Sequence, residues 1–384
     1  MKNAVRVSFL IAACALGLAA CGGGGEPAPT SFPGIAVDGA NSYLVSNLRV
    51  YKFDAASGKE AWHFPATTDN SNPRGPFGGP PVKVGNLIIV GGTIGNAGAV
   101  DKHIYGINDA DGAQKWAWEA PVATSIHREF VDGVTADGNT IYAASGDGNL
   151  YALDVSGALP QLKWTFATQN KLWARPAVAD GKVYLPALDH TLYIIDAGTG
   201  KEAGRFTASA SLASTPALSG SVLFFGSFDQ KVYAINANSG QKLWETARLN
   251  AWFWCQPLVV NNTVYIGDVK GKFYALDAKT GQVKWTSVLG GAIRAAPVAN
   301  GNKLYVASFD SYLYSFDLNP TPDSSLNVAP TRVQENGLGR RLLSTPALSK
   351  GTLLVPLFDG DIKVTALNLE NNTKVYEYPP KAAS

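Results

Sequence analysis

The chain has 384 residues, of which 46% are hydrophobic and 16% are charged, and its formal net charge is +2. This composition excludes an intrinsically disordered chain, and the absence of a dense Lys/Arg block argues against a nucleic-acid partner. The 40 Gly and 22 Pro, set among 15 Tyr and 16 Phe, favour many short strands joined by tight turns. We therefore expect an all-β protein.

The N-terminal residues 1–20 have the pattern of a bacterial lipoprotein signal peptide. Two basic residues precede an uncharged run that is shorter than the roughly 20 residues a membrane-spanning helix needs. The run ends in the tetrapeptide LAAC at 18–21, which resembles the bacterial lipobox. This resemblance implies cleavage before Cys21 and lipidation of its thiol.

The segment 21–32, CGGGGEPAPTSF, is expected to be a flexible tether. Because two or more acyl chains give stable anchoring, we expect a protein held on a membrane surface without crossing it. The residue after the lipidated cysteine is not the aspartate that signals inner-membrane retention in many bacteria, so an outer-membrane location facing the periplasm follows if that membrane exists. Loss of Lys2 and Arg6 leaves 30 basic residues against 30 acidic ones, a net charge of zero.

Residues 33–380 repeat one sequence pattern, seen most clearly in FYALDAKTGQVKW at 273–285. An apolar strand is followed by a D-x-x-T-G turn and by a second strand that carries a tryptophan. The tyrosine of the pattern recurs about every 41 residues in the middle of the chain. Its copies lie at Tyr51, Tyr105, Tyr151, Tyr193, Tyr233, Tyr274 and Tyr314, with a degenerate eighth copy at Thr365–Asn368.

A second half precedes each copy and completes a unit of four strands. In ARPAVADGKVYLPAL at 174–188, a small-Pro-apolar strand is followed by a turn and by a β-branched and aromatic strand. Strands that are apolar on both faces must be covered by neighbouring sheets, and eight four-stranded units close naturally into a radial propeller. We predict an eight-bladed β-propeller. A seven-bladed ring, in which the weak last copy adds strands to another blade, is the alternative.

The turn and the tryptophan of each repeat have predictable roles. Asp277 can accept hydrogen bonds from the turn backbone, and Gly281 supplies the positive φ of a three-residue turn with a bulge. The spacing between Tyr274 and Trp285 recurs in other copies. We expect this tryptophan to lie on the outermost strand and to fill the seam with the next repeat.

The repeat also points to a family. The pattern A-x-D-x-x-T-G-x-x-x-W, complete at Ala275–Trp285 and nearly complete at Ala234–Trp244, resembles the PQQ-like propeller repeat. Eight such repeats behind a lipobox resemble the BamB-type lipoproteins. This resemblance implies a non-catalytic scaffold without a cofactor, which holds the outer-membrane β-barrel assembly complex as its partner. No partner-contacting residue is carried over, because the family's contact motifs have no match at 210–216 or 249–257.

Two other functional classes stay open. PQQ-like blades also form dehydrogenases that use pyrroloquinoline quinone and calcium, but this chain lacks an adjacent cysteine pair, and its turn aspartates are expected to cap turns. A glycan- or peptide-binding module would use the aromatic residues ahead of the innermost strands, among them Trp173 and Phe253. No pair of histidines has metal-ligand spacing, and Cys255 is expected to be a buried hydrophobic residue.

The working surface is predicted where the chain passes from one blade into the next. The residues just before each small-Pro strand should gather around one mouth of the central channel. Those predicted to bind a partner are Arg128, Arg175, Arg294 and Arg341, with Trp252 and Trp254 between them. The alternatives are that the arginines bridge neighbouring blades, or that the inserted loops Asp69 to Gly79 or Asn319 to Asn336 form the surface.

Overall fold

The computed structural model describes residues 33–46, 48–66, 76–94, 101–121, 130, 132–358 and 360–379. Their regular structure consists of eight four-stranded antiparallel sheets, which we call blades 1 to 8 in chain order. This confirms the eight-bladed propeller and rules out the seven-bladed alternative. The signal peptide 1–20, Cys21, the tether and Arg128 lie outside the described residues. No helix in the described part has the length and apolarity of a membrane span.

The strands of each blade follow one another in space as they do in sequence, from the centre outward. The innermost strands are β1 (Gly34–Asp38), β5 (Gly78–Val84), β9 (Val134–Asp137), β13 (Ala177–Ala179), β17 (Ala217–Ser219), β21 (Leu258–Val260), β25 (Val298–Asn300) and β29 (Ala347–Ser349). The second strands are β2 (Asn41–Ser46), β6 (Leu87–Ile94), β10 (Thr140–Ala144), β14 (Lys182–Pro186), β18 (Val222–Gly226), β22 (Thr263–Gly267), β26 (Lys303–Ala307) and β30 (Thr352–Pro356).

The outer half of each blade carries the tyrosine and tryptophan pattern. The third strands are β3 (Arg49–Asp54), β7 (Asp101–Asn108), β11 (Asn149–Asp154), β15 (Thr191–Asp196), β19 (Val232–Asn236), β23 (Lys272–Asp277), β27 (Leu313–Asp317) and β31 (Val364–Asn368). The outermost strands are β4 (Glu60–Phe64), β8 (Gln114–Glu119), β12 (Gln161–Ala167), β16 (Glu202–Thr207), β20 (Lys242–Glu245), β24 (Val283–Val288), β28 (Thr331–Arg332) and β32 (Lys374–Tyr378).

Blade 6 shows how the repeat folds locally. Residues 273–276 of β23 are buried on both faces, as the continuous apolar run predicts. At the turn, Asp277 Oδ1 accepts bonds from the backbone N–H groups of Lys279 (3.0 Å) and Thr280 (2.9 Å), and Gly281 has φ +73°. The pairing of β23 with β24 shifts register after Ala275, so the predicted bulge is present.

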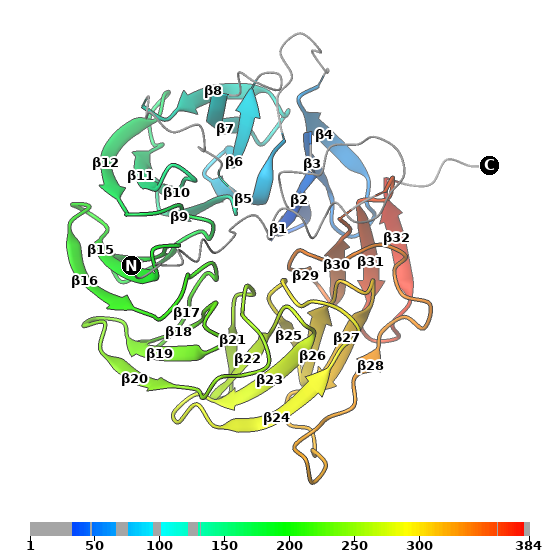
Figure 1. Cartoon of the computed structure of the whole chain (residues 1–384). Helices are drawn as coiled ribbons and strands as arrows, with labels where there is room; N and C mark the ends of the chain where they lie inside the picture. Colours follow the sequence, from blue (N-terminus) through cyan, green and yellow to red (C-terminus); the bar gives the residue numbers. More distant parts are fainter. Residues whose placement is uncertain are drawn as a thin grey trace, which may run out of the picture. The chain divides into compact units, whose positions relative to one another are not determined.

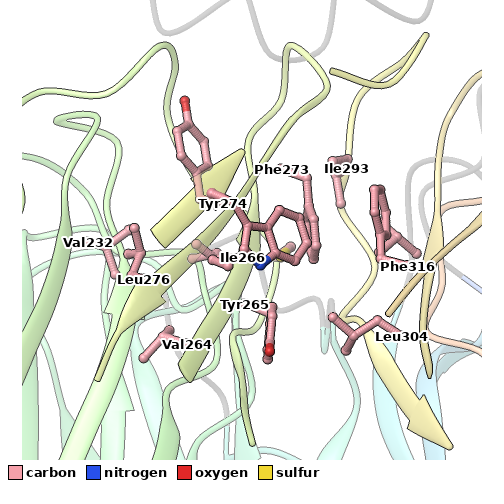
Figure 2. Packing of buried hydrophobic residues seen from close by; sticks show 14 of the residues in the cluster. Val232, Val264, Tyr265, Ile266, Phe273, Tyr274, Leu276, Ile293, Leu304 and Phe316 are labelled. Carbon is pink, nitrogen blue, oxygen red and sulfur yellow. The ribbon is translucent and has the colours of Figure 1, made fainter. Parts of the chain in front are cut away.

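Blades pack face to face through alternate side chains of the third strand. Figure 2 shows Leu276 beside Val232 of blade 5, whereas Phe273 points toward Phe316 of blade 7. The rings of Phe273 and Phe316 stack with their centroids 5.4 Å apart. Period-two alternation therefore sends successive residues of one strand into two different seams, which explains why the strand is apolar throughout.

The seam tryptophans lie where the repeat predicts. The indole Nε1 of Trp62 donates to Asp109 O of the next blade (2.8 Å), and those of Trp164 and Trp244 donate to Ala197 O (3.0 Å) and Ala278 O (2.9 Å). Each of these acceptors lies in the turn between the third and fourth strands of the following blade. The tryptophan thus fixes the angle between consecutive blades.

The ring closes by packing, because blades 1 and 8 share no strand. Figure 1 shows β1 between β5 and β29, and these strands are in contact. Tyr376 occupies the tryptophan position of blade 8, and its hydroxyl donates to Ala55 O of blade 1 (2.9 Å). The ring of Tyr378 stacks on Phe53 with centroids 4.7 Å apart. The degenerate eighth copy therefore forms the same kind of seam as the others.

Hydroxyl groups also join neighbouring blades near the centre. Thr135 Oγ1 donates to Pro176 O (2.7 Å), and Ser214 Oγ donates to Cys255 O (2.8 Å). Ala296 N donates to Thr345 Oγ1 (3.0 Å). Each such bond contributes about 1 kcal/mol net, so these contacts supplement the apolar seams rather than replace them.

Blade 7 departs from the repeat. Its outermost strand, β28, pairs with β27 at only two positions, Tyr314 with Arg332 and Ser315 with Thr331. The inserted segment ahead of β28 instead reaches blade 6, where Thr286 N donates to Leu326 O (2.7 Å) and Val328 N donates to Thr286 O (2.8 Å). The loop predicted at Asn319 to Asn336 is thus partly used to cover the edge of β24.

The two ends of the propeller are built from different connections. At one end, the turn between strands 1 and 2 bonds the turn between strands 3 and 4, as in Ala197 N to Gly181 O (2.9 Å). We call this the turn end. At the other end, the connection between strands 2 and 3 bonds the segment entering the blade, as in Leu188 N to Lys171 O (3.1 Å). We call this the mouth.

Candidate functional site

The segments that enter the blades at the mouth line a central cavity of about 270 Å³. In blades 4 to 8 each segment has the pattern x-small-y-Pro, in which x and y line the cavity. The small residue between them is buried away from the cavity in blades 4 to 7, whereas Ser344 of blade 8 also lines it. The x residues are Trp173, Ala213, Trp254, Arg294 and Leu343, and the y residues are Arg175, Thr215, Gln256, Ala296 and Thr345. Extended backbone with period two therefore produces two tiers of side chains around the channel.

The polar part of the lining joins blades 3, 4 and 5. Asp132 Oδ2 accepts a hydrogen bond from Thr215 Oγ1 (3.2 Å) and lies 3.8 Å from the guanidinium Nε of Arg175. Thr215 Oγ1 also lies 3.1 Å from the backbone oxygen of Arg175. Burial raises the pKa of Asp132, against the lowering effect of Arg175 and Thr215. Asp132 lines the cavity, and 38% of its side chain is accessible, so solvent moderates this upward shift.

The aromatic part of the lining is a wall that ends in an arginine. The rings of Trp173 and Trp254 are nearly parallel, at 17°, with centroids 5.8 Å apart. The guanidinium carbon of Arg294 lies 5.1 Å from the centroid of Trp254. At this distance the cation lies within reach of the negative face of the indole ring. Trp254 and Arg294 therefore form a cation–π pair that joins blades 6 and 7.

A second group of aromatic and arginine side chains lies at the rim of the mouth, outside the lining of the cavity. The Trp252 ring packs on Phe228 (4.5 Å between centroids) and on Trp254 (5.9 Å). The guanidinium of Arg341 lies over the rings of both Phe309 (5.1 Å) and Phe358 (5.2 Å). All these side chains are half-buried, so each presents part of its surface at the mouth.

The structure brings together most of the residues that the sequence singled out. Arg175, Trp254 and Arg294 line the cavity, and Trp252 and Arg341 lie at its rim. Arg175 also contacts an aspartate of the neighbouring blade, as the structural alternative for the arginines expects. Whether these residues bind a partner stays a prediction.

Sequence reasoning missed several members of the site. Asp132 precedes a strand that lacks the small-Pro signature, so no motif marked it. Thr215 and Gln256 could have been found from the two-residue periodicity of the entering segments. The rim phenylalanines follow the second strands at one repeat position, in the recurring Phe-Asp pairs that start at Phe228 and Phe309.

The remaining candidates have structural roles. Cys255 is buried, and burial raises the pKa of its thiol to about 12, which removes it as a nucleophile at neutral pH. Asp154 and Asp196 accept backbone bonds from Ser156 and Thr199 in their turns, as predicted. Asp317 instead forms an ion pair with a lysine of the adjacent strand.

The lining can also be tested against pyrroloquinoline quinone and calcium. Calcium takes six to eight oxygen ligands. Of the described lining residues, Asp132 alone carries a carboxylate, and this group already accepts a bond from Thr215. Among the described residues, no three or more His, Cys, Asp or Glu side chains lie close enough together to hold a metal ion. This lining does not fit a calcium-bound quinone, and we derive no chemical step through one.

Eight four-stranded blades, three of which are joined to the next blade by a tryptophan-to-turn bond, define this chain as a propeller of PQQ-like repeats. The model of the family described as outer membrane protein assembly factor BamB matches residues 26–159, 117–251 and 229–383. The chain belongs to this family.

Solved structures share the fold at low sequence identity. BamB from Moraxella catarrhalis is 16% identical, with a TM-score of 0.67, over 86% of this chain and 92% of that one. The computationally designed protein Ika8 is 15% identical, with a TM-score of 0.66, over 88% and 97%. Quinohemoprotein alcohol dehydrogenase from Comamonas testosteroni is 15% identical, with a TM-score of 0.57, over 71% and 62%. These likenesses concern the fold alone.

A curated relative shares part of the chain. The serine/threonine-protein kinase AfsK of Streptomyces griseus is 27% identical over 162 residues, which is 41% of this chain. The match spans 18% of the length of the kinase.

Proposed function

We propose that this chain is a lipid-anchored, non-catalytic scaffold of the cell envelope that captures a protein partner at the mouth of the propeller. Membership of the BamB family supports outer-membrane protein assembly as its setting and the β-barrel assembly complex as its partner. The lipobox-like segment that ends at Cys21 supports attachment to a membrane surface, which would be the periplasmic face of an outer membrane.

The observation that carries the proposal is the distribution of arginine and aromatic side chains. Trp252, Trp254, Arg294 and Arg341 come from three different blades, yet contact one another or neighbouring rings at one end of the ring. Tryptophan and arginine are enriched at the energetic centres of protein interfaces. Because these side chains already contact neighbouring rings, less conformational entropy is lost when a partner binds.

Crosslinking in the native envelope, followed by mass spectrometry, tests the proposal. The wild-type chain should recover a protein of the barrel-assembly complex, and the double variant Arg294→Ala/Arg341→Ala should recover much less. A matched control removes two lysines from the turn end, Lys201→Ala/Lys279→Ala, and should leave recovery unchanged. Equal recovery of the partner by wild type and by the arginine variant would contradict the proposed site.

The anchor is tested separately. Cys21→Ser should abolish lipidation and release the chain from the membrane fraction, because the tether that follows has no apolar face. A Cys21→Ser protein that stays in that fraction after a salt wash would contradict the lipoprotein assignment.

A further inference from the structure

The central cavity has two chemically different sides. Blades 1 and 2 contribute an apolar side with Ile35, Pro80 and Pro81, which Leu343 of blade 8 extends, whereas Ser344 and Thr345 of blade 8 are polar. Blades 3 to 7 contribute the arginines, the stacked tryptophans and the polar side chains. An occupant that matches both sides therefore needs an apolar part and a polar or charged end.

Charge selects the polar end of that occupant. The described lining residues with a full charge are Arg175, Arg294 and Asp132, which leaves an excess of one positive charge. Asp132 lies near Arg175, while Arg294 enters from a blade on the other side of Trp254. Guanidinium groups favour a carboxylate, because the charge-assisted hydrogen bonds between the two are stronger than neutral ones.

Size limits what can enter. At about 270 Å³ the cavity is smaller than the range of roughly 300–1,000 Å³ typical of ligand pockets. This volume suits one side chain or a comparably small group. The proposed partner would dock at the mouth into which the cavity opens, so it is the natural source of that side chain.

We propose that the cavity receives one acidic side chain of the docking partner, with its carboxylate on the Arg175 and Arg294 side and its methylene stem against Trp254 and the apolar side. This inference rests on the proposed function, since it names the group by which the same partner is held. It makes the mouth a two-part site: the rim gives contact area, and the cavity selects for a carboxylate.

A matched peptide pair tests the cavity without the partner. Binding of acetyl-Ala-Glu-Ala-amide and acetyl-Ala-Gln-Ala-amide to the purified chain is measured by calorimetry at millimolar peptide concentration. We expect the glutamate peptide to bind about tenfold more tightly, because the amide cannot form charge-assisted bonds with a guanidinium. Arg294→Met and Arg175→Met keep the stems of the side chains and should each reduce this preference, whereas Lys279→Ala at the turn end should not.

The outcomes separate the inference from the proposed function. Equal binding of the two peptides, or a glutamate preference that survives in both arginine variants, overturns the inference even if the rim captures its partner. Saturable binding of a neutral glycan such as maltose, without a glutamate preference, also overturns it. If Arg294→Met does not fold by circular dichroism, Arg294→Lys replaces it and should retain a reduced preference for the glutamate peptide.

Discussion

The two ends of the propeller are built from different connections, and they differ in how strictly they repeat. At the turn end, an Asp or Asn caps the turn and a glycine follows, as in Asp196 with Gly200 and Asp277 with Gly281. At the mouth, equivalent positions carry different side chains, as in Trp173, Ala213 and Arg294. The turn positions make the same contact in successive blades and therefore keep the same residue types. The cavity-lining positions at the mouth are not held to one residue type in this way, so they can carry side chains that bind a partner.

The largest expected effect lies in the seams between blades. Trp285→Ala should lower the free energy of unfolding by about 3 to 5 kcal/mol, because it removes a 4% exposed ring packed on Phe316 of the next blade. Trp252→Ala, at the mouth, removes a half-buried ring and should lower the free energy of unfolding by less than Trp285→Ala does. Urea unfolding of the two variants measures the difference, and equal losses would break the distinction between seam and mouth.

The seam between blades 8 and 1, which closes the ring, can be tested at the turn end with a single glycine. Gly58 has φ +71°, and a Cβ there would lie 2.5 Å from the ring of Tyr376. Gly58→Ala should therefore cost about 1 to 3 kcal/mol through strain and displacement of the ring. Gly39→Ala is the matched control, because its φ is +61° but nothing lies near its Cβ. A melting temperature of Gly58→Ala equal to that of Gly39→Ala would contradict this closure.

The seam between blades 1 and 2 should respond to acid. Asp109 lies 2.7 Å from Lys52 Nζ, 3.0 Å from Lys83 Nζ and 2.8 Å from Tyr43 Oη. Burial opposes its ionisation, but the bonds from Lys52, Lys83 and Tyr43 outweigh this effect and hold the pKa of Asp109 below its usual 3.8. Its stabilising effect is therefore complete above that value and is lost as pH falls through the lower folded-state pKa.

Thermal unfolding between neutral pH and pH values below 4 measures this contribution. Asp109→Asn should have a lower melting temperature than wild type at neutral pH, and the difference between the two melting temperatures should decrease as the pH falls. A constant gap across the whole range would show that Asp109 is not ionised in the folded protein.

The smallest expected effect on stability comes from the mouth. Arg341→Ala removes a guanidinium that lies over two half-buried rings, Phe309 and Phe358, and such contacts contribute about 0.5 to 1 kcal/mol each at exposed sites. The decrease in the free energy of unfolding, measured with urea, should therefore stay well below that of Trp285→Ala. A loss as large would mean that Arg341 is a seam residue.

The fold could be predicted because each repeat satisfies the same local rules. The turn at Asp277 follows from local rules alone. The strand at 273–276, which is apolar on both faces, and the tryptophan of the repeat each need a neighbouring blade, and eight such units close into a ring. The eighth copy is degenerate in the sequence because Thr365 replaces the repeat tyrosine, although Tyr376 makes the same contact with the next turn as the seam tryptophans.

The site was predictable only in part, because its residues do not repeat. Arginine and tryptophan before the small-Pro strands indicated the mouth. The sequence did not show that Arg294 lies over the Trp254 ring or that Arg341 lies over the rings of Phe309 and Phe358. Asp132 lacks any motif, and its pairing with Arg175 depends on the ring geometry. Contacts between different blades follow from closure of the whole ring, which no single repeat contains.

Partner capture by the two ends of the ring tests the central claim most directly. Crosslinking efficiency in the native envelope is compared for wild type, Arg294→Ala/Arg341→Ala at the mouth and Lys201→Ala/Lys279→Ala at the turn end. Each double variant removes two positive charges, so net charge is matched. We predict that only the mouth variant loses its partner while its melting temperature stays near that of wild type. Loss of the partner by the turn-end variant, with capture by the mouth variant intact, would contradict the assignment.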